Sequence, residues 1–111
     1  MPDVQEFIDL AHAYDLPVIV DAAAEGDLKK YYQMGAECVI YSGTKALCGP
    51  TSGLIVGKKS YIDLIKKQYA GIGRIMKVGK ENIIGLTYAI EEYMNQPQLT
   101  IEQQKDRLKR V

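Results

Sequence analysis

The chain has 111 residues, of which 47% are hydrophobic and 25% charged, and its fourteen basic side chains balance fourteen acidic ones. This length allows at most one domain, and the composition is that of an ordinary soluble globular protein. A formal charge of zero gives no general attraction to nucleic acid or acidic membranes, and no apolar run approaches the roughly 20 residues that span a bilayer.

The N-terminus and the two cysteines indicate a cytoplasmic protein. The opening stretch MPDVQEFIDL lacks the basic region of a secretory signal peptide. Cys38 and Cys48 lie ten residues apart, with no CxxC pair and no histidine nearby. We therefore expect a reduced pair of thiols and no metal site.

The first half of the chain predicts a parallel βαβ unit. Apolar residues at helical spacing predict a helix over residues 4–14, with His12 on its solvent-facing side. The β-branched run 17–21 predicts a strand buried on both faces of a sheet. A short helix over 28–34 follows, capped by Asp27 and ended by Gly35. A second strand is expected over 38–41, parallel to the first.

The second half predicts one antiparallel strand and further helices. The connection 42–52 is too short for a crossover helix, so the strand 53–57 is expected to run antiparallel to its predecessor. Residues 58–69 predict an amphipathic helix, 70–79 a glycine-rich basic loop, and 80–94 a long helix. The first of these is expected to turn four side chains inward, namely Tyr61, Leu64, Ile65 and Tyr69.

The last residues predict a helix that continues to the end of the chain. Thr100 and Gln103 have the spacing of a capping box, and no Gly, Asn or Pro stop follows before Val111. We expect residues 1–111 to form a single partial domain from a longer protein, with 97–111 beginning a helix.

Two polar side chains follow neighbouring predicted strands. Asp21 ends the first strand, and Lys45 lies in the segment SGTK just after the second. Ligands of open α/β sheets bind beyond the carboxyl ends of the strands, which are about 4.8 Å apart, so both groups can face one crevice. Pyridoxal phosphate needs a lysine amine for its aldehyde and an acid near its pyridine nitrogen. The pair therefore predicts a pyridoxal-phosphate site.

Three strings support this interpretation, namely VIVDAAAE, YSGTKALCGPTSGLIVGKK and GIGRIMKVGKE. Over residues 15–95 they resemble the aspartate-aminotransferase-like large domain of fold-type-I pyridoxal-phosphate enzymes. The branch they resemble is the family of selenocysteine synthase (L-seryl-tRNA selenium transferase) and D-glucosaminate-6-phosphate ammonia-lyase. The resemblance implies an α/β fold with a mainly parallel sheet, one antiparallel strand, and helices on its faces.

The resemblance also implies roles for particular residues. Lys45 would be the Schiff-base lysine, and Asp21 the partner of the pyridinium nitrogen. Ala23 would pack on the ring face, Ser42 would donate to the cofactor phosphate, and Gly43 would let the backbone approach the cofactor. Positive charge near the cofactor or an anionic substrate, including across a subunit interface, would come from Arg74, Lys77 and Lys80.

Each of these residues also has an ordinary structural interpretation. Lys45 is also a residue type of exposed loops, and Asp21 is also a residue type that caps turns. Ser42 is equally a residue of a Ser-Gly turn. The three basic residues at 74, 77 and 80 are equally those of a solvated loop. The spacing of Asp21 and Lys45 around a βαβ unit favours the functional interpretation.

The resemblance implies an enzyme that eliminates ammonia from an anionic amino acid or amino-sugar acid, as a cytoplasmic homodimer or larger homo-oligomer. The 111 residues alone are expected to be inactive, because the small domain and the phosphate-binding glycine loop would lie outside them. One alternative is seryl-tRNA selenium transfer, with tRNA as partner. Its pattern has acidic residues where this chain has Thr44 and Gly79. Another alternative is a non-catalytic α/β module.

Overall fold

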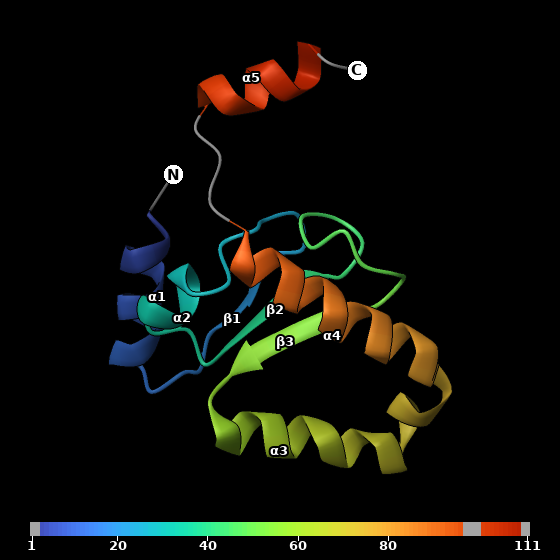
Figure 1. Cartoon of the computed structure of the whole chain (residues 1–111). Helices are drawn as coiled ribbons and strands as arrows, with labels where there is room; N and C mark the ends of the chain where they lie inside the picture. Colours follow the sequence, from blue (N-terminus) through green and yellow to red (C-terminus); the bar gives the residue numbers. More distant parts are fainter. Residues whose placement is uncertain (1–2, 97–100, 110–111) are drawn as a thin grey trace.

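A computed structural model describes residues 3–96 and 101–109. Within residues 3–96, the helices lie around a three-stranded mixed sheet (Figure 1). The strands β1 (Ile19–Asp21), β2 (Cys38–Ser42) and β3 (Gly53–Gly57) lie in the order β1-β2-β3. β1 runs parallel to β2, and β3 runs antiparallel to it. The predicted α/β class and both predicted strand directions are confirmed.

The core lies on one face of this sheet. The helix α1 (Val4–Ala13) and the short helix α2 (Lys30–Gln33) flank this face, with Ile8 of α1 and Tyr31 of α2 in the core. The strands contribute alternate residues to it, as half-buried strands do, and the buried set is Ile8, Val18, Ala22, Tyr31, Ala36, Val39 and Tyr41. Each large side chain buried in this way contributes about 1.5–3 kcal/mol.

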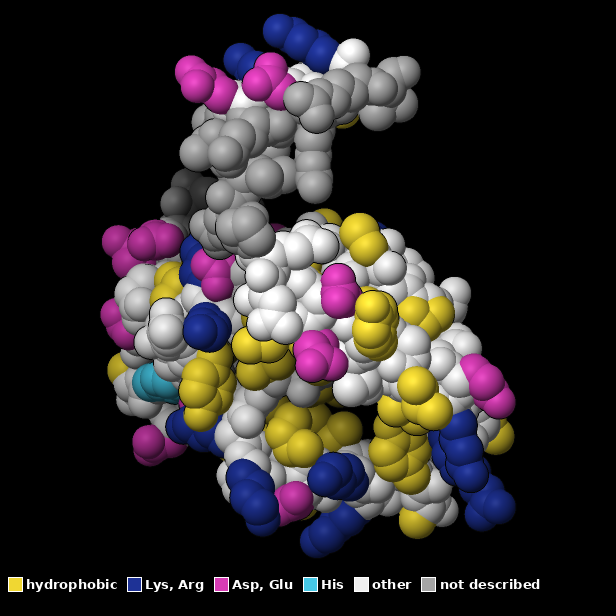
Figure 2. Space-filling model, in the orientation of Figure 1, with side chains coloured by type: hydrophobic (Ala, Val, Ile, Leu, Met, Phe, Trp, Pro, Cys, Tyr) yellow, Lys and Arg dark blue, Asp and Glu magenta, His cyan; other side chains and the backbone are white. Residues whose placement is uncertain are grey.

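The other residues of each strand project from the opposite face, where much apolar surface remains exposed. Ile19 is 62% exposed, Ile40 37% and Ile55 39%. Figure 2 shows hydrophobic side chains in the hollow between α3 and α4. The prediction that residues 17–21 are buried on both faces is therefore wrong. β1 is an edge strand of the described sheet, so Ile19 has a neighbouring strand on one side only.

After β3 the chain forms α3 (Lys59–Lys67), two 3₁₀ turns over Gln68–Ala70 and Ile72–Met76, and α4 (Lys80–Asn95). The prediction of a loop over 70–79 is only partly right, because the 3₁₀ turns occupy most of it; the N–H groups of Gly71 and Arg74 close i→i+3 bonds there. Leu64 and Tyr69 were expected to face inward, but each is 55% exposed. No residue of α3 is fully buried.

The predicted C-terminal helix is present as α5 (Ile101–Lys109). Thr100, and with it the predicted capping box, lies outside the described residues. None of the helices described over residues 3–96 and 101–109 has both the length and the apolar character that a membrane crossing requires.

Candidate functional site

Asp21 ends β1 and begins a turn that stays attached to β2. Its Oδ1 accepts a hydrogen bond of 3.1 Å from the Ala23 N–H, as in an Asx turn. The Ala22 N–H donates to the Ile40 carbonyl at 2.9 Å, and the Ser42 N–H donates to the Ala23 carbonyl at 3.2 Å. The parallel pairing thus continues past Asp21, which leaves its carboxylate exposed at the carboxyl end of the sheet.

The turn after Ala23 is held by tyrosine hydroxyls from three different elements. Each residue of the run 25–27 accepts a hydrogen bond from one tyrosine hydroxyl. Tyr31 Oη donates to Glu25 Oε1 at 2.6 Å, Tyr93 Oη to the Gly26 carbonyl at 2.6 Å, and Tyr41 Oη to the Asp27 carbonyl at 2.7 Å. The hydrogen bond to Glu25, together with burial, raises the pKa of Tyr31 to about 12. Glu25 therefore has a structural partner in this turn.

Asp27 performs the capping role expected of it. Its Oδ1 accepts from the N–H groups of Lys29 and Lys30, each at 3.0 Å. These two hydrogen bonds hold the pKa of the Asp27 carboxyl below its usual value. The helix that follows is shorter than the predicted 28–34, because regular helical bonding extends only over Lys30–Gln33.

Lys45 lies in a loop that closes on Gly43. The Gly43 N–H donates to the Ser52 carbonyl at 2.9 Å, and the Gly43 carbonyl accepts from Gly49 at 2.7 Å. A turn from Lys45 to Cys48 is closed by a 3.0 Å bond from the Cys48 N–H to the Lys45 carbonyl. The loop therefore has a defined backbone, and the Lys45 side chain stands exposed on it.

This loop lies along α4. The Asn82 side-chain amide donates to the Thr51 carbonyl at 2.7 Å near the start of the helix. A Cβ added at Gly49 would lie 3.1 Å from Leu86 and 3.4 Å from Ala89, so loop and helix are in close contact. Leu86 is the buried residue of α4. The loop 43–52 and the turn 22–28 thus both rest on the same helix.

The turns that carry Asp21 and Lys45 meet at Gly26. A methyl group added there would lie 3.2 Å from the Ala46 Cβ, directly beside Lys45, and would overlap the Tyr93 hydroxyl. Asp21 and Ser42 project from the same face of the sheet, because both alternate with core residues of their strands. Five predicted site residues therefore lie on two touching turns: Asp21, Ala23, Ser42, Gly43 and Lys45.

The three predicted basic residues lie elsewhere. Arg74 is in the second 3₁₀ turn, Lys77 follows it, and Lys80 begins α4. Lys80 is thirteen residues before Tyr93, which contacts the turn 22–28. At 1.5 Å per helical residue this is about 20 Å. The structure does not bring this basic segment to the turn of Asp21 within one chain.

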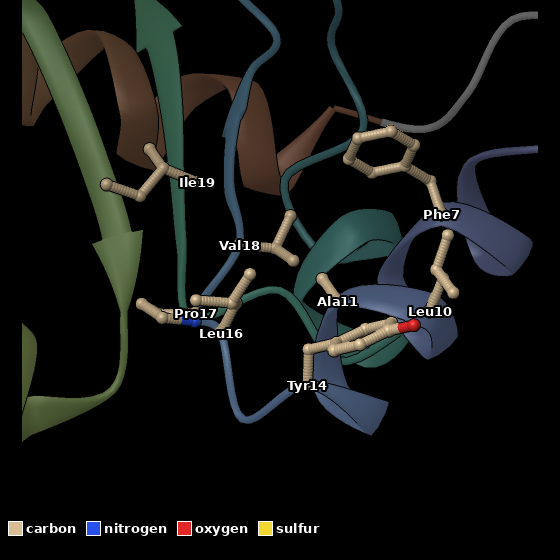
Figure 3. A pocket seen from close by; sticks show the side chains of 8 residues that line it. All are labelled: Phe7, Leu10, Ala11, Tyr14, Leu16, Pro17, Val18 and Ile19. Carbon is tan, nitrogen blue, oxygen red and sulfur yellow. The ribbon is translucent and has the colours of Figure 1, made fainter.

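An apolar groove at the entry to β1 does not include Asp21 or Lys45. It is formed by α1 and the chain leading into β1, with its walls at Phe7, Leu10, Ala11, Tyr14, Leu16, Pro17, Val18 and Ile19 (Figure 3). Five of these side chains are each more than half exposed, namely Phe7, Leu10, Tyr14, Leu16 and Ile19. Among the described residues no group of three or more His, Cys, Asp or Glu is arranged to hold a metal ion.

Comparison with known proteins identifies the family. The family model for L-seryl-tRNA selenium transferase matches residues 2–108. The chain belongs to the L-seryl-tRNA selenium transferase family. The relatives that it matches are named for different enzyme activities.

Among the relatives of this family member is a D-glucosaminate-6-phosphate ammonia lyase of Salmonella typhimurium, 52% identical over 101 residues, or 91% of this chain and 27% of the relative. A 5'-C-glycyluridine monooxygenase-decarboxylase of a Streptomyces species is 46% identical over 86% of the chain and 24% of the relative. An L-seryl-tRNA(Sec) selenium transferase of Caldanaerobacter subterraneus is 32% identical over 80% of the chain and 22% of the relative.

A solved structure of D-glucosaminate-6-phosphate ammonia-lyase superposes with a TM-score of 0.82 at 50% identity, covering 93% of this chain and 28% of that one. The chain spans about a quarter of the length of the relatives it matches. The expected resemblance to the selenium transferase and ammonia-lyase family is confirmed.

At one departure from the selenium-transferase pattern, the structure shows a specific contact. The Thr44 hydroxyl lies 3.0 Å from Ser42 Oγ, and the Thr44 N–H donates to Ser42 Oγ at 3.3 Å. In this family member the residue before Lys45 therefore contacts the Ser42 hydroxyl through both its own hydroxyl and its backbone N–H. Sequence reasoning assigned roles to Ser42 and Lys45 but not to Thr44.

Proposed function

We propose that this chain carries part of the active site of a pyridoxal-phosphate-dependent ammonia lyase. The substrate would be an anionic amino acid or amino-sugar acid of the D-glucosaminate 6-phosphate type. The proposal extends to a cytoplasmic homo-oligomer with the fold-type-I large domain. It is supported by the 52% identity to the ammonia lyase, which exceeds the 32% to the selenium transferase.

One observation carries the proposal: an acid and an amine stand exposed on two touching turns at the carboxyl ends of parallel strands. The polar groups exposed on these turns suit the acid, amine and phosphate contacts that the cofactor needs. The Asp21 carboxylate has Oδ1 in one local hydrogen bond, and among the described residues no salt bridge involves the Lys45 amine. Ser42 and Thr44 add two neighbouring hydroxyls suited to a phosphate.

The residues would divide the work by their chemistry. Lys45 would hold the cofactor aldehyde, Asp21 would keep the ring nitrogen protonated, and Ser42 would donate to the phosphate. Ala23, small and half-buried, would line the ring face, and Gly43 would keep the backbone close. When bound, the cofactor supplies an electron sink for a carbanion next to the amino group.

Lys45 is also the group placed to move a proton. As a neutral amine released by substrate it would accept the proton from the substrate α-carbon, as a general base does. The β-hydroxyl would leave as water with the proton that Lys45 took up, and hydrolysis by one water would release ammonia and a keto acid. The nitrogen of the ammonia therefore comes from the substrate, and Lys45 returns to its neutral form.

The basic residues Arg74, Lys77 and Lys80 fit this scheme only in an assembly. Since about 20 Å of helix separates Lys80 from the residue of α4 that contacts the turn 22–28, we propose that these side chains serve the anionic substrate of a second subunit. The exposed apolar residues beside them, Ile75 and Met76, are consistent with such an interface.

The whole protein, purified and supplied with pyridoxal phosphate, tests the proposal. We expect a yellow protein that borohydride bleaches, with the reduced label on Lys45 by mass spectrometry. We also expect ammonia to be released from D-glucosaminate 6-phosphate. A colourless protein, or a label on another lysine only, would refute the assignment of the site.

Seryl-tRNA selenium transfer remains a second candidate because of one observation. Residues 58–80 hold seven Lys and Arg side chains against one acidic residue, Asp63, although the whole chain is neutral. Such a basic surface suits a phosphate backbone. A gel shift with seryl-tRNA distinguishes the candidates: tight binding without ammonia release would reverse their order. A non-catalytic α/β module would show neither colour nor binding.

A further inference from the structure

Both turns of the proposed site rest on α4, and they reach it at different points. The loop of Lys45 contacts the helix through Gly49, which packs against Leu86 and Ala89. The turn of Asp21 contacts it through the 2.6 Å hydrogen bond from Tyr93 Oη to the Gly26 carbonyl. The helix is therefore a common support for the acid and the amine.

Gly26 is where the three segments come together. Its α-carbon hydrogens face the Tyr93 hydroxyl and the Ala46 side chain so closely that an added methyl group would overlap the former. Ala46 is the neighbour of Lys45 in the chain. Any movement of Gly26 away from α4 would therefore change the separation between the turn of Asp21 and the loop of Lys45.

Tyr93 differs from the other two tyrosines that hold this turn. Tyr31 and Tyr41 come from α2 and β2, which belong to the same βαβ unit as the turn itself. Tyr93 comes from 67 residues further along the chain and is half-buried at the contact. It is the one of the three that joins the turn to the helix supporting Lys45.

We propose that Tyr93 is a positioning residue of the cofactor site, which sets the placement of Asp21 relative to Lys45 by holding Gly26 against α4 and Ala46. The inference rests on the proposed function but assigns Tyr93 no contact with cofactor or substrate. Removal of its hydroxyl would let the turn move, so that the carboxylate of Asp21 no longer meets the ring nitrogen at its best position.

The test compares Tyr93→Phe with Tyr88→Phe in the whole protein. Tyr88 lies on the same helix but is 66% exposed, so it is a matched control for loss of one phenol oxygen. We expect Tyr93→Phe to weaken the binding of pyridoxal phosphate about twofold to tenfold, the range for one neutral hydrogen bond. We also expect it to shift the pH at which the visible absorbance of bound cofactor changes. Tyr88→Phe should alter neither quantity.

A second variant tests whether Gly26 and Tyr93 act through the same contact. Gly26→Ala should weaken cofactor binding strongly, because its methyl group meets the Tyr93 hydroxyl. In the double variant with Tyr93→Phe the extra cost of Gly26→Ala should be smaller, since the obstructing oxygen is gone. Equal costs in the two backgrounds would overturn the inference.

The outcomes are distinct. If the wild-type protein binds no pyridoxal phosphate, the proposed function fails and the inference fails with it. If the wild type binds but Tyr93→Phe retains its affinity and absorbance profile, only the inference is refuted. A lowered melting temperature for Tyr93→Phe with unchanged cofactor behaviour has the same meaning, because it indicates a merely structural hydrogen bond.

Discussion

The imidazole of His12 on α1 lies 2.8 Å from the carboxylate of Glu37, a buried residue just before β2. The other carboxylate oxygen accepts a 2.6 Å hydrogen bond from the Val18 N–H at the entry to β1. Lys58, just after β3, is 3.8 Å away. Glu37 thus links α1 to the residues that enter β1 and β2 and to the residue that follows β3. This cluster lies at the end of the sheet opposite Asp21.

This cluster predicts acid sensitivity. Burial alone would raise the pKa of Glu37, but the backbone N–H groups of Val18 and Glu37 and the His12 ring outweigh burial, so the pKa is lowered. A lowered native pKa gives stability that is present above the unfolded value, 4.5, and is lost as the pH falls through the native value. We expect Glu37→Gln to cost about 1–3 kcal/mol near neutral pH.

Urea unfolding of the whole protein at a series of pH values checks this prediction. The difference between wild type and Glu37→Gln should be constant above about pH 5 and should shrink below the unfolded pKa, because only the wild type loses a charge there. Glu91→Gln, an exposed change on α4, is the control. A difference that stays constant down to the acid transition would contradict the role given to the Glu37 charge.

Tyr31 predicts an effect at the alkaline end. Its pKa of about 12 exceeds the ordinary value of 10.0, chiefly because its hydroxyl donates to Glu25. A raised native pKa gives stability that is present below pH 10 and is lost as the pH rises through about 12. Tyr31→Phe should therefore cost about 1.5–3 kcal/mol at neutral pH and progressively less above pH 10.

Phenolate absorbance titrates the tyrosines directly and provides the measurement. One phenol titrating near pH 12 should disappear in Tyr31→Phe and should remain in Tyr32→Phe, its exposed neighbour on α2. Burial also raises the pKa of Tyr41, so the two variants are compared with each other. If the late absorbance change is as large in Tyr31→Phe as in Tyr32→Phe, the hydrogen bond to Glu25 does not have the stated strength.

Much of the fold was readable from local patterns, whereas the supports of the site were not. The β-branched runs and the lengths of the connections were enough to predict both strand directions and the turns of Asp21 and Lys45. The contacts His12–Glu37 and Tyr93–Gly26 join residues 25 and 67 positions apart. The periodicity of a sequence does not reveal which distant residue a side chain contacts. The helical spacing of Tyr93 indicates only a residue at the edge of the core.

The exposure of Ile19 was misjudged for a different physical reason. An unbroken apolar run is typical of a strand that is covered on both faces of its sheet, and the pattern does not say which elements cover it. Ile19 lies on the face opposite the core, on the edge strand of the described sheet, and is 62% exposed. The 3₁₀ turns of 68–76 were missed because Gly71 and Gly73 are also the residues of an open loop.

Gly43 predicts a steric requirement in the Lys45 loop. A methyl group there would overlap Ser52 Oγ and lie 3.0 Å from Leu86. We expect Gly43→Ala to cost about 1–3 kcal/mol, the usual range for overpacking, and to weaken cofactor binding by displacing the loop. Gly53→Ala is the matched control, since its methyl group would meet only the Tyr41 carbonyl, at 3.6 Å. Thermal melts and cofactor titrations of both variants measure the losses of stability and of cofactor affinity. Equal losses in Gly43→Ala and Gly53→Ala would contradict the steric requirement at Gly43.

Asp21 predicts a charge effect on turnover. In the proposed enzyme Asp21→Asn keeps the size of the side chain and its local hydrogen bond to Ala23 but cannot hold a proton on the ring nitrogen. We expect kcat to fall about a hundredfold or more, the lower range for a positioned acid or base. Asp63→Asn, in an exposed pair with Lys59, should leave kcat unchanged. A full kcat in Asp21→Asn would contradict the role of the carboxylate.

The free edge of β1 predicts self-association of the 111-residue chain on its own. Val18 and Ala22 bond to the β2 side, so by alternation the N–H and C=O groups of Ile19 and Asp21 point outward. An exposed apolar strand edge is a template for pairing with another copy. Ile19→Lys should therefore reduce the concentration-dependent rise in light scattering, because a charge on an edge strand opposes pairing. Ile84→Lys, at a 71% exposed apolar site on α4, is the control. If both variants act equally, general apolar exposure and not the strand edge causes the association.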